Sequence, residues 1–195
     1  MSQRVEGEYR QVVVRLAGTA ANATPLVGAE IGVAEGKTSE MLLRACPRLT
    51  LHMVDPWLGD RDVDDCYWQS GDDQARKTQR EMDAQHDAAI RRTAAFSRSR
   101  AIIHHTTSLA VAATVPDDSL SFVFIDGDHT EPAVYADSQQ WWRKLRPDGL
   151  MIWHDYGNYL SVGEAVRRFV AGLDLWYEHD DKLFLAWAHK TAKEE

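Results

Sequence analysis

Short apolar runs alternate along the chain with longer segments whose apolar side chains recur at helical spacing. Five apolar runs predict buried strands, at residues 25–33, 49–55, 101–105, 121–126 and 150–153. Helices are predicted at residues 5–16, 38–46, 72–96, 108–113, 130–145 and from 161 onwards. The fourth run is apolar on both faces, which is typical of a central strand in a parallel sheet.

The end of the chain has a different pattern. Two short apolar runs, at residues 173–177 and 183–187, predict an antiparallel hairpin. Ser161 and Glu164 have the spacing of a capping box at the start of the last helix. Because strand and helix alternate elsewhere, we expect one α/β domain over residues 1–195. It would be a Rossmann-like, doubly wound, mostly parallel sheet with this hairpin at its end, binding ligands at the carboxyl ends of its strands.

The charge balance narrows the classes of partner. The chain has 195 residues, enough for one domain with its own core. It carries 22 Lys and Arg against 30 Asp and Glu, a net charge of −8. Protein surfaces that bind nucleic acid or anionic membranes are basic, so neither is an expected partner. Two cysteines, no membrane-spanning run and no signal-peptide core predict a cytoplasmic protein. A homo-oligomer is compatible with this composition.

The first strand runs into a glycine turn with two interpretations, Glu30-Ile31-Gly32-Val33-Ala34-Glu35-Gly36-Lys37-Thr38. Residues 36–38 match the end of a phosphate-binding loop, but that loop requires a glycine at position 31, where this chain has Ile. The alternative is an acidic residue followed by glycines that let a ligand approach the backbone. Asp55, at the end of the second strand, would then accept hydrogen bonds from a ribose diol. A plain tight turn explains the same residues.

Four further segments make the pattern specific. They are Val54-Asp55-Pro56-Trp57, Ile125-Asp126-Gly127-Asp128-His129, Leu145-Arg146-Pro147-Asp148-Gly149-Leu150 and His154-Asp155-Tyr156. With the glycine turn they resemble the class I S-adenosylmethionine-dependent methyltransferases, in the order that this family has. The resemblance is greatest to the macrocin and mycinamicin type of small-molecule O-methyltransferase and more distant to the catechol O-methyltransferases. It covers residues 27–156 except segment 59–99, and it implies methyl transfer to a hydroxyl of a sugar or polyphenol.

The resemblance also implies a cofactor, S-adenosylmethionine, and a set of residues that bind it. These residues are Glu30, Gly32, Gly36, Asp55, Trp57, Thr107, Ser108 and Asp126. The first three would hold the methionine end, Asp55 would take the ribose hydroxyls, and Trp57 would lie near the sugar or adenine. Thr107 and Ser108 would lie at the adenine edge, where a plain helix cap is the alternative.

A metal triad is implied by the ends of the fourth and fifth strands. Asp126 ends the fourth strand, and His154 and Asp155 end the fifth. These strands are neighbours in the family, so the three side chains would converge on one ion. The second member is usually a carboxylate in metal-dependent relatives. His154 therefore leaves the ion open between Mg²⁺ and Mn²⁺, with Fe²⁺ and Zn²⁺ as further options. The alternative is a set of helix caps without an ion.

His129 occupies the position of the proposed general base in the mycinamicin-type relatives. An imidazole suits removal of a proton from a hydroxyl that a metal has made more acidic. The alternative is a helix-start histidine that only contacts Asp126 or Asp155.

Segment 59–99 lies outside the resemblance. Its acidic residues 60–65, followed by Tyr67 and Trp68, predict a lid or insertion after the second strand, with a solvated loop as the alternative. Two other functional classes stay open: a non-catalytic cofactor-binding protein on the same fold, and a nucleotide hydrolase.

Overall fold

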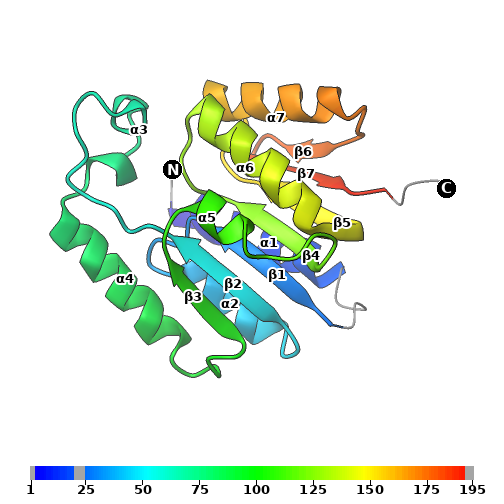
Figure 1. Cartoon of the computed structure of the whole chain (residues 1–195), viewed down its shortest axis with the longest axis horizontal. Coiled ribbons are helices and arrows are strands. Elements are labelled where there is room, and N and C mark those ends of the chain that lie inside the picture. The colour runs from blue at the N-terminus through cyan, green and yellow to red at the C-terminus, as the bar shows by residue number, and fades with distance from the viewer. Residues whose placement is uncertain (1–2, 20–24, 192–195) are drawn as a thin grey trace.

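A single seven-stranded sheet forms the centre of the molecule, in the order β3-β2-β1-β4-β5-β7-β6 (Figure 1). The computed structural model describes residues 3–19 and 25–191. The strands are β1 (Val27–Ile31), β2 (Thr50–Asp55), β3 (Ala101–His105), β4 (Leu120–Ile125), β5 (Leu145–Trp153), β6 (Glu178–Asp180) and β7 (Leu185–His189). β1 to β5 pair in parallel, and β7 lies antiparallel between β5 and β6. The predicted Rossmann-like sheet with an antiparallel C-terminal hairpin is confirmed.

Helices cover both faces of this sheet. They are α1 (Gln3–Thr19), α2 (Lys37–Ala45), α3 (Cys66–Gln69), the 3₁₀ turn η2 (Gln74–Arg76), α4 (Gln79–Thr93), α5 (Ser108–Ala112), α6 (Glu131–Lys144) and α7 (Leu160–Gly172). α1, α2 and α4 pack on one face, and α5, α6 and α7 pack on the other. β4 serves both layers: Phe122 and Phe124 join the first cluster, and Val123 and Ile125 join the second. This is why its sequence is apolar on both faces.

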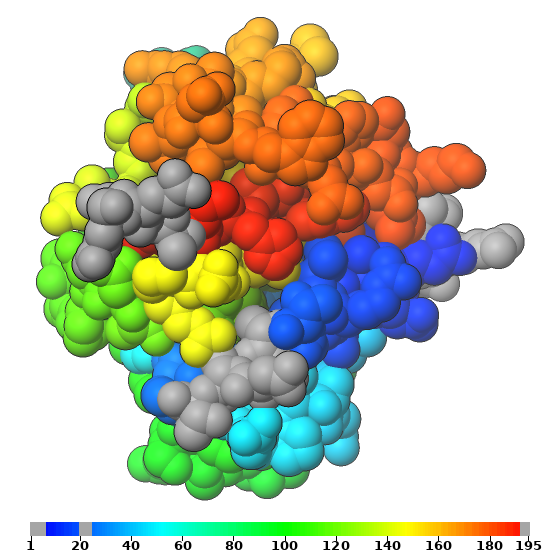
Figure 2. All heavy atoms as spheres, turned by 90° about the vertical axis from the view of Figure 1, so that its right-hand side faces the viewer, coloured from blue at the N-terminus to red at the C-terminus, as the bar shows by residue number. Residues whose placement is uncertain are grey.

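α1 packs beside the C-terminal strands although the two are far apart in the sequence. Figure 2 shows α1 between α2 and these strands. Val13 and Ala17 are fully buried. The first helix is therefore part of the core, and it brings Tyr9 to the carboxyl ends of the strands. Over residues 3–19 and 25–191, every helix is too short or too polar to span a bilayer.

Two predicted details at the end of the chain are wrong. The hairpin begins at Glu178 and not at residues 173–177. Leu175 and Tyr177 do not pair with β7, because they pack against the hydrophobic cluster on the face of the sheet that α5, α6 and α7 cover. Ser161 does not cap α7. Its hydroxyl donates a hydrogen bond to the carbonyl oxygen of His129 at 2.6 Å, and Tyr159 occupies the N-cap position.

The predicted helix at residues 72–96 is divided. η2 ends at Arg76, and α4 starts after a capping box formed by Thr78 and Glu81. From Gln79 onwards the segment belongs to the helical layer on one face of the sheet, whereas residues 72–78 form a loop with a short 3₁₀ turn.

Candidate active site

The carboxyl ends of β1, β2, β4 and β5 open into one cavity of about 690 Å³. Its lining includes the strand-end residues Glu30, Asp55, Asp126, His154 and Asp155. β1 leads to α2 on one face of the sheet, and the adjacent β4 leads to α6 on the other. This is the topological switch point at which doubly wound sheets bind ligands. The cavity therefore lies where the fold predicts a binding site.

Gly32 and Gly36 allow close packing of the glycine turn. Gly32 has φ +86°, and a Cβ there would collide with the carbonyl oxygen of Asp126. Gly36 has φ +76°, and a Cβ there would lie 2.9 Å from the Cα of Ala89 in α4. Gly32 lines the cavity, whereas Gly36 faces α4. Only the first of the two glycines presents its main chain to a ligand.

Asp55 organises the same turn. Its Oδ2 accepts hydrogen bonds from the N–H groups of Val33 and Ala34, both at 2.9 Å, and its Oδ1 accepts one from Trp57 N–H at 2.7 Å. Burial raises the pKa of Asp55, and these three donors oppose the rise. Each carboxylate oxygen has a second lone pair, so Asp55 keeps acceptor capacity toward the cavity that it lines.

Trp57 lies behind the turn. Its side chain is fully buried, its indole N–H donates to the carbonyl oxygen of Ala34 at 2.9 Å, and its ring centroid lies 4.4 Å from that of His86. The cavity lining does not include Trp57. The structure therefore places it as a support of the turn, without a face toward a ligand.

Glu30 is a buried acid in the cavity wall. It is 2% exposed and accepts a hydrogen bond from the hydroxyl of Ser39 in α2. Burial raises the pKa of Glu30 to about 8. The Ser39 hydrogen bond and the Arg10 guanidinium oppose the rise, and the Asp126 and Asp55 carboxylates add to it. A cationic ligand group beside Glu30 would lower the cost of its charge.

The loop after β3 contributes Thr107 and Ser108 to the cavity. Thr107 occupies the N-cap position of α5, but its side chain makes no capping hydrogen bond. The Ser108 hydroxyl donates to Asp137 Oδ1 at 2.6 Å and accepts the indole N–H of Trp141 at 2.7 Å. Ser108 is thus tied to α6, and burial raises the pKa of Asp137 to about 7.

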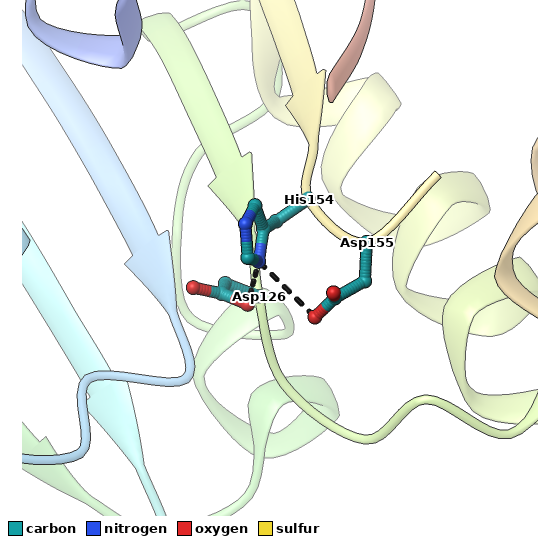
Figure 3. Close-up of side chains that lie close together, drawn as sticks. All are labelled: Asp126, His154 and Asp155. Atoms are coloured by element: carbon teal, nitrogen blue, oxygen red, sulfur yellow. Dashed lines mark hydrogen bonds and ion pairs between the residues drawn. The ribbon is translucent and has the colours of Figure 1, made fainter. Parts of the chain in front are cut away.

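Asp126, His154 and Asp155 converge at the ends of β4 and β5 (Figure 3). His154 Nδ1 lies 2.8 Å from Asp126 Oδ1 and 3.1 Å from Asp155 Oδ2. Asp155 has φ +58°, a left-handed conformation that Asp adopts more readily than most residues. The convergence implied by the resemblance is present.

His129 joins this cluster from the turn between β4 and α6. Its Nε2 lies 3.1 Å from Asp155 Oδ2 and 3.8 Å from Asp126 Oδ1. Its Nδ1 lies 2.6 Å from Asp72 Oδ2. The ring stacks on Tyr159 with 4.6 Å between centroids. Carboxylates therefore face both nitrogens of this imidazole, and an aromatic ring holds its face.

The imidazoles and carboxylates of the cluster shift one another's pKa values. Burial opposes a charge on either ring, but the carboxylates raise the pKa of His154 to about 9 and that of His129 well above its usual value. Burial also opposes charge on Asp155 and Asp126, but the two imidazoles lower the pKa of each carboxyl. The cavity thus holds a compact set of opposite charges.

The donor set of the triad fits a divalent cation. The three residues offer ligand atoms that all lie within 4.8 Å of one another, and no other such group occurs within the described ranges. The two carboxylates suit Mg²⁺ or Mn²⁺, and the imidazole also suits Fe²⁺ or Zn²⁺. The His154 ring is fixed by packing, since its centroid lies 3.9 Å from that of Tyr9, and its Nε2 is buried without a hydrogen-bond partner. Nδ1 faces both carboxylates, at 2.8 Å and 3.1 Å, and is therefore the candidate ligand atom.

The predicted lid separates into two parts. α4 packs through Met82 and Ala89 into the core and belongs to the helical layer. The loop before it projects beyond the carboxyl ends of the strands (Figure 1). This loop adds Arg61, Tyr67, Asp72 and Gln74 to the cavity lining.

Sequence analysis did not assign Tyr9, Asp72 or Asp137 to the site, although all three line the cavity. Of these three residues only Asp137 could have been found from the sequence. It shares helical spacing with Val134 and Trp141, which places an acid on the buried face of α6. Tyr9 and Asp72 come from segments with no local motif, and only the tertiary fold brings them to the site.

Comparisons with known proteins agree with this geometry. The profile of a family described as "Methyltransferase domain" matches residues 29–156. The solved structure of the O-methyltransferase NovP is 20% identical, with a TM-score of 0.70 over 97% of this chain and 80% of that chain. TomG from Streptomyces achromogenes, an O-methyltransferase solved with S-adenosylmethionine, is 16% identical, with a TM-score of 0.60 over 92% and 79%. An O-methyltransferase from Bacillus cereus in complex with S-adenosylhomocysteine is 14% identical, with a TM-score of 0.60 over 97% and 82%. A search of curated proteins gives no match.

The chain belongs to this methyltransferase family, because the matched residues 29–156 make up more than half of it. It is a methyltransferase with the class I fold, as the sheet order and the solved structures agree. The identification made from the sequence motifs is confirmed at the level of family and fold.

Proposed function

We propose that this protein transfers a methyl group from S-adenosylmethionine to a hydroxyl of a small molecule, assisted by a divalent cation. The observation that carries the proposal is the position of His129. Its imidazole lies beside the convergent Asp-His-Asp set, in the same cavity as Glu30 and the glycine turn. A base, a candidate metal site and a candidate cofactor site thus share one cavity, which is the arrangement that transfer to an oxygen requires.

The methionine and ribose parts of the cofactor are assigned to the ends of β1 and β2. S-adenosylmethionine, when bound, supplies an electrophilic methyl group on a sulfonium. Glu30 would pair with its amino group, Gly32 would present main chain to it, and Asp55 would accept hydrogen bonds from the ribose hydroxyls. A buried carboxylate such as Glu30 suits a cationic ligand and repels a polyphosphate, which disfavours the nucleotide hydrolase.

The remaining cofactor residues act at the adenine end and behind the turn. Thr107 and Ser108 would lie at the adenine edge, with Ser108 held by its hydrogen bonds to α6. Gly36 and Trp57 would act through the shape of the turn, because neither lines the cavity.

Asp126, His154 and Asp155 would hold the cation. When bound, it would draw the acceptor hydroxyl close and lower the pKa of that hydroxyl. Asp126 also adjoins Gly32 through the close contact of their backbones, so it faces the cofactor side as well. Mg²⁺ and Mn²⁺ are the ions that this donor set favours.

His129 would accept the hydroxyl proton at Nε2 in its neutral form. The surrounding carboxylates raise the pKa of His129 well above its usual value, and a cation held by Asp126 and Asp155 would offset two of them and so favour the neutral imidazole. The neighbouring Asp155 carboxylate stabilises the imidazolium that results, since the two atoms lie 3.1 Å apart. Much of the rate would come from holding the deprotonated oxygen in line with the methyl group.

A hydroxylated ring is the proposed acceptor class, a sugar or a polyphenol. The cavity offers the rings of Tyr67 and Tyr159 and the amide of Asn158. Aromatic rings beside polar groups suit such a ligand. The net charge of −8 supports a small molecule over nucleic acid or a membrane. The free cysteines Cys46 and Cys66 support a cytoplasmic location.

Two measurements test the proposed function. Calorimetric titrations with S-adenosylhomocysteine and with ATP should show heat for the first alone. Mass spectrometry of a panel of sugars and polyphenols, incubated with enzyme, S-adenosylmethionine and Mg²⁺, should then show a product heavier by one methyl group. Binding without product across the panel would favour the non-catalytic cofactor-binding protein.

Replacing Asp55 should weaken cofactor binding and also loosen the turn. Asp55→Ala is expected to weaken S-adenosylhomocysteine binding by roughly 5- to 150-fold, the effect of a hydrogen bond to a charged group. It should also lower the Tm of the ligand-free protein, because three backbone N–H groups lose their acceptor. Asp87→Ala, at an exposed helical position of α4, is the control. Unchanged affinity in Asp55→Ala would remove this residue from the site.

Cofactor binding should depend on pH through Glu30. With a pKa of about 8, Glu30 is mostly protonated at pH 7, whereas pairing with a cationic amino group requires the carboxylate. Affinity for S-adenosylhomocysteine should therefore fall as pH decreases from 8 to 6, by up to tenfold per unit. Calorimetry at pH 7 in buffers of different ionisation enthalpy should show proton release on binding. Glu30→Gln should bind more weakly and lose the release. Equal affinity from pH 6 to 8 would contradict the assignment.

A further inference from the structure

Asp72 is a buried carboxylate in a part of the chain that is mostly exposed. It lies in the loop of residues 60–78, whose side chains are mostly exposed. Between residues 60 and 80 only Asp72 and Ala75 are buried, and Asp72 is 4% exposed. Burying a carboxylate is costly unless it meets a partner, so its surroundings indicate its role.

The loop is closed at its base and reaches the site at its tip. Asp60 N–H donates to the Lys77 carbonyl oxygen at 3.0 Å, and Gln79 N–H donates to Asp60 Oδ2 at 3.1 Å. The two ends of the loop are thus joined by hydrogen bonds. Asp72 lies between these ends in the sequence, and its carboxylate meets His129 inside the cavity.

Each oxygen of Asp72 has a defined partner. Oδ1 accepts the backbone N–H of Gln74 at 2.8 Å. Oδ2 accepts the hydroxyl of Tyr67 at 2.9 Å and lies 2.6 Å from His129 Nδ1. The Tyr67 ring is held in turn by the Arg61 guanidinium, 4.9 Å from its centroid. The loop thus brings one carboxylate oxygen within 2.6 Å of one nitrogen of the imidazole.

We propose that Asp72 is a positioning residue for His129, and that docking of the loop at residues 60–78 completes the catalytic centre. The inference rests on the proposed role of His129. A carboxylate at Nδ1 keeps a proton on that nitrogen and directs Nε2 toward Asp126 and Asp155, where the acceptor oxygen would lie. Closure of the loop over the acceptor and orientation of the base are then one event.

The other contacts of His129 hold its ring but lie away from Nδ1. Tyr159 stacks on the ring, and Ser161 bonds the backbone carbonyl oxygen. Asp126 and Asp155 both approach the ring at Nε2. Of the three carboxylates around the ring only Asp72 lies outside the proposed cation site, so Asp72 can hold a proton at Nδ1 while Asp126 and Asp155 hold the cation.

The test is Asp72→Asn, measured against Asp73→Asn on the adjacent exposed residue. An amide can donate toward Nδ1 and favour the wrong tautomer. We expect kcat to fall about 10- to 100-fold, with the KM for the acceptor, the affinity for S-adenosylhomocysteine and the Tm close to those of Asp73→Asn. Tyr67→Phe, which removes one hydroxyl from Asp72, should show a smaller fall of the same kind. Asp72→Glu should recover part of the lost kcat.

A spectroscopic measurement does not depend on turnover. In ¹⁵N-labelled protein the imidazole signals of His129, assigned by comparison with His129→Gln, should show a protonated Nδ1 that changes in Asp72→Asn but not in Asp73→Asn. The inference is overturned if these signals are unchanged, or if kcat falls only together with Tm and ligand affinity. If the wild type neither binds S-adenosylhomocysteine nor methylates any acceptor, the proposed function fails instead.

Discussion

Removal of the His129 imidazole is expected to lower kcat by roughly 10²- to 10⁴-fold, the range for loss of a general base. The Nε2 atom lies in the cavity beside Asp155 and Asp126, at 3.1 Å and 3.8 Å from their carboxylate oxygens. His129→Ala leaves Glu30 and Asp55 unchanged, so the affinity for S-adenosylhomocysteine should stay within a few-fold of the wild type. Single-turnover kinetics at saturating cofactor would isolate the effect on the methyl-transfer step.

His189→Ala is the matched control, because His189 is exposed at the end of β7, away from the cavity lining. It should leave kcat unchanged. Near-normal turnover in His129→Ala would show that the histidine only balances the charge of Asp155 and Asp72. A lower Tm with normal kcat would lead to the same conclusion, since three carboxylates would then lose a cationic partner.

The parallel strands β1 to β5 were predictable because each contains a local apolar run, whereas β6 (Glu178–Asp180) is polar and was not predicted. The run at residues 121–126 is apolar on both faces and becomes the central strand β4, buried along its whole length. Residues 173–177 misled the prediction for the same reason: Leu175 and Tyr177 are apolar and partly buried, but they lie in a loop packed against the core and not in a strand. An apolar pattern indicates that a segment is buried, but it does not distinguish a strand from a packed loop.

The site was predictable where its residues follow strands directly. Asp126, His154 and Asp155 meet because β4 and β5 are neighbours in register, with Ile125 opposite Trp153. Trp57 and Gly36 also follow strands, yet neither lines the cavity: the Trp57 ring packs against His86, and Gly36 packs against Ala89 of α4. The direction in which a residue faces at a turn depends on the backbone torsion angles, and the types of the neighbouring residues do not determine those angles.

Asp72 and Tyr9 were beyond sequence reasoning for another reason. Each reaches the site across a long stretch of chain, Asp72 from a loop after β2 and Tyr9 from α1. No spacing rule relates them to His129 and His154, the rings that they contact. Such contacts arise from packing of whole elements, so the residues that orient a catalytic group are harder to predict than the group itself.

Removal of the divalent cation is expected to abolish turnover. Dialysis against a chelator followed by assay should show no methylated product, and Mg²⁺ or Mn²⁺ should restore it. The reason is the donor set: Asp126, His154 and Asp155 place two carboxylates and an imidazole nitrogen within 4.8 Å of one another. Without an ion, the acceptor hydroxyl would keep a pKa far above that of His129, and proton transfer would be slow.

Binding of the ion can be measured apart from activity, by the electron paramagnetic resonance signal of free Mn²⁺. Asp155→Asn should weaken Mn²⁺ binding by more than about tenfold while leaving the affinity for S-adenosylhomocysteine close to that of the wild type. Asn is preferable to Ala because residue 155 has φ +58°, which Asn tolerates. Asp148→Asn is the matched control, since Asp148 is also left-handed, with φ +63°, but exposed.

His154 decides which ion is preferred. If its Nδ1 is a ligand, His154→Asp should shift the preference from Mn²⁺ toward Mg²⁺, because an all-oxygen set favours the harder ion. The ratio of activities with the two ions, measured at saturating metal, reports this shift. Full activity in excess chelator, together with no Mn²⁺ binding by the wild type, would show that the triad only balances charge. Methyl transfer would then depend on His129 and on the position of the acceptor, with the Asp126 and Asp155 carboxylates paired to imidazoles as the structure has them.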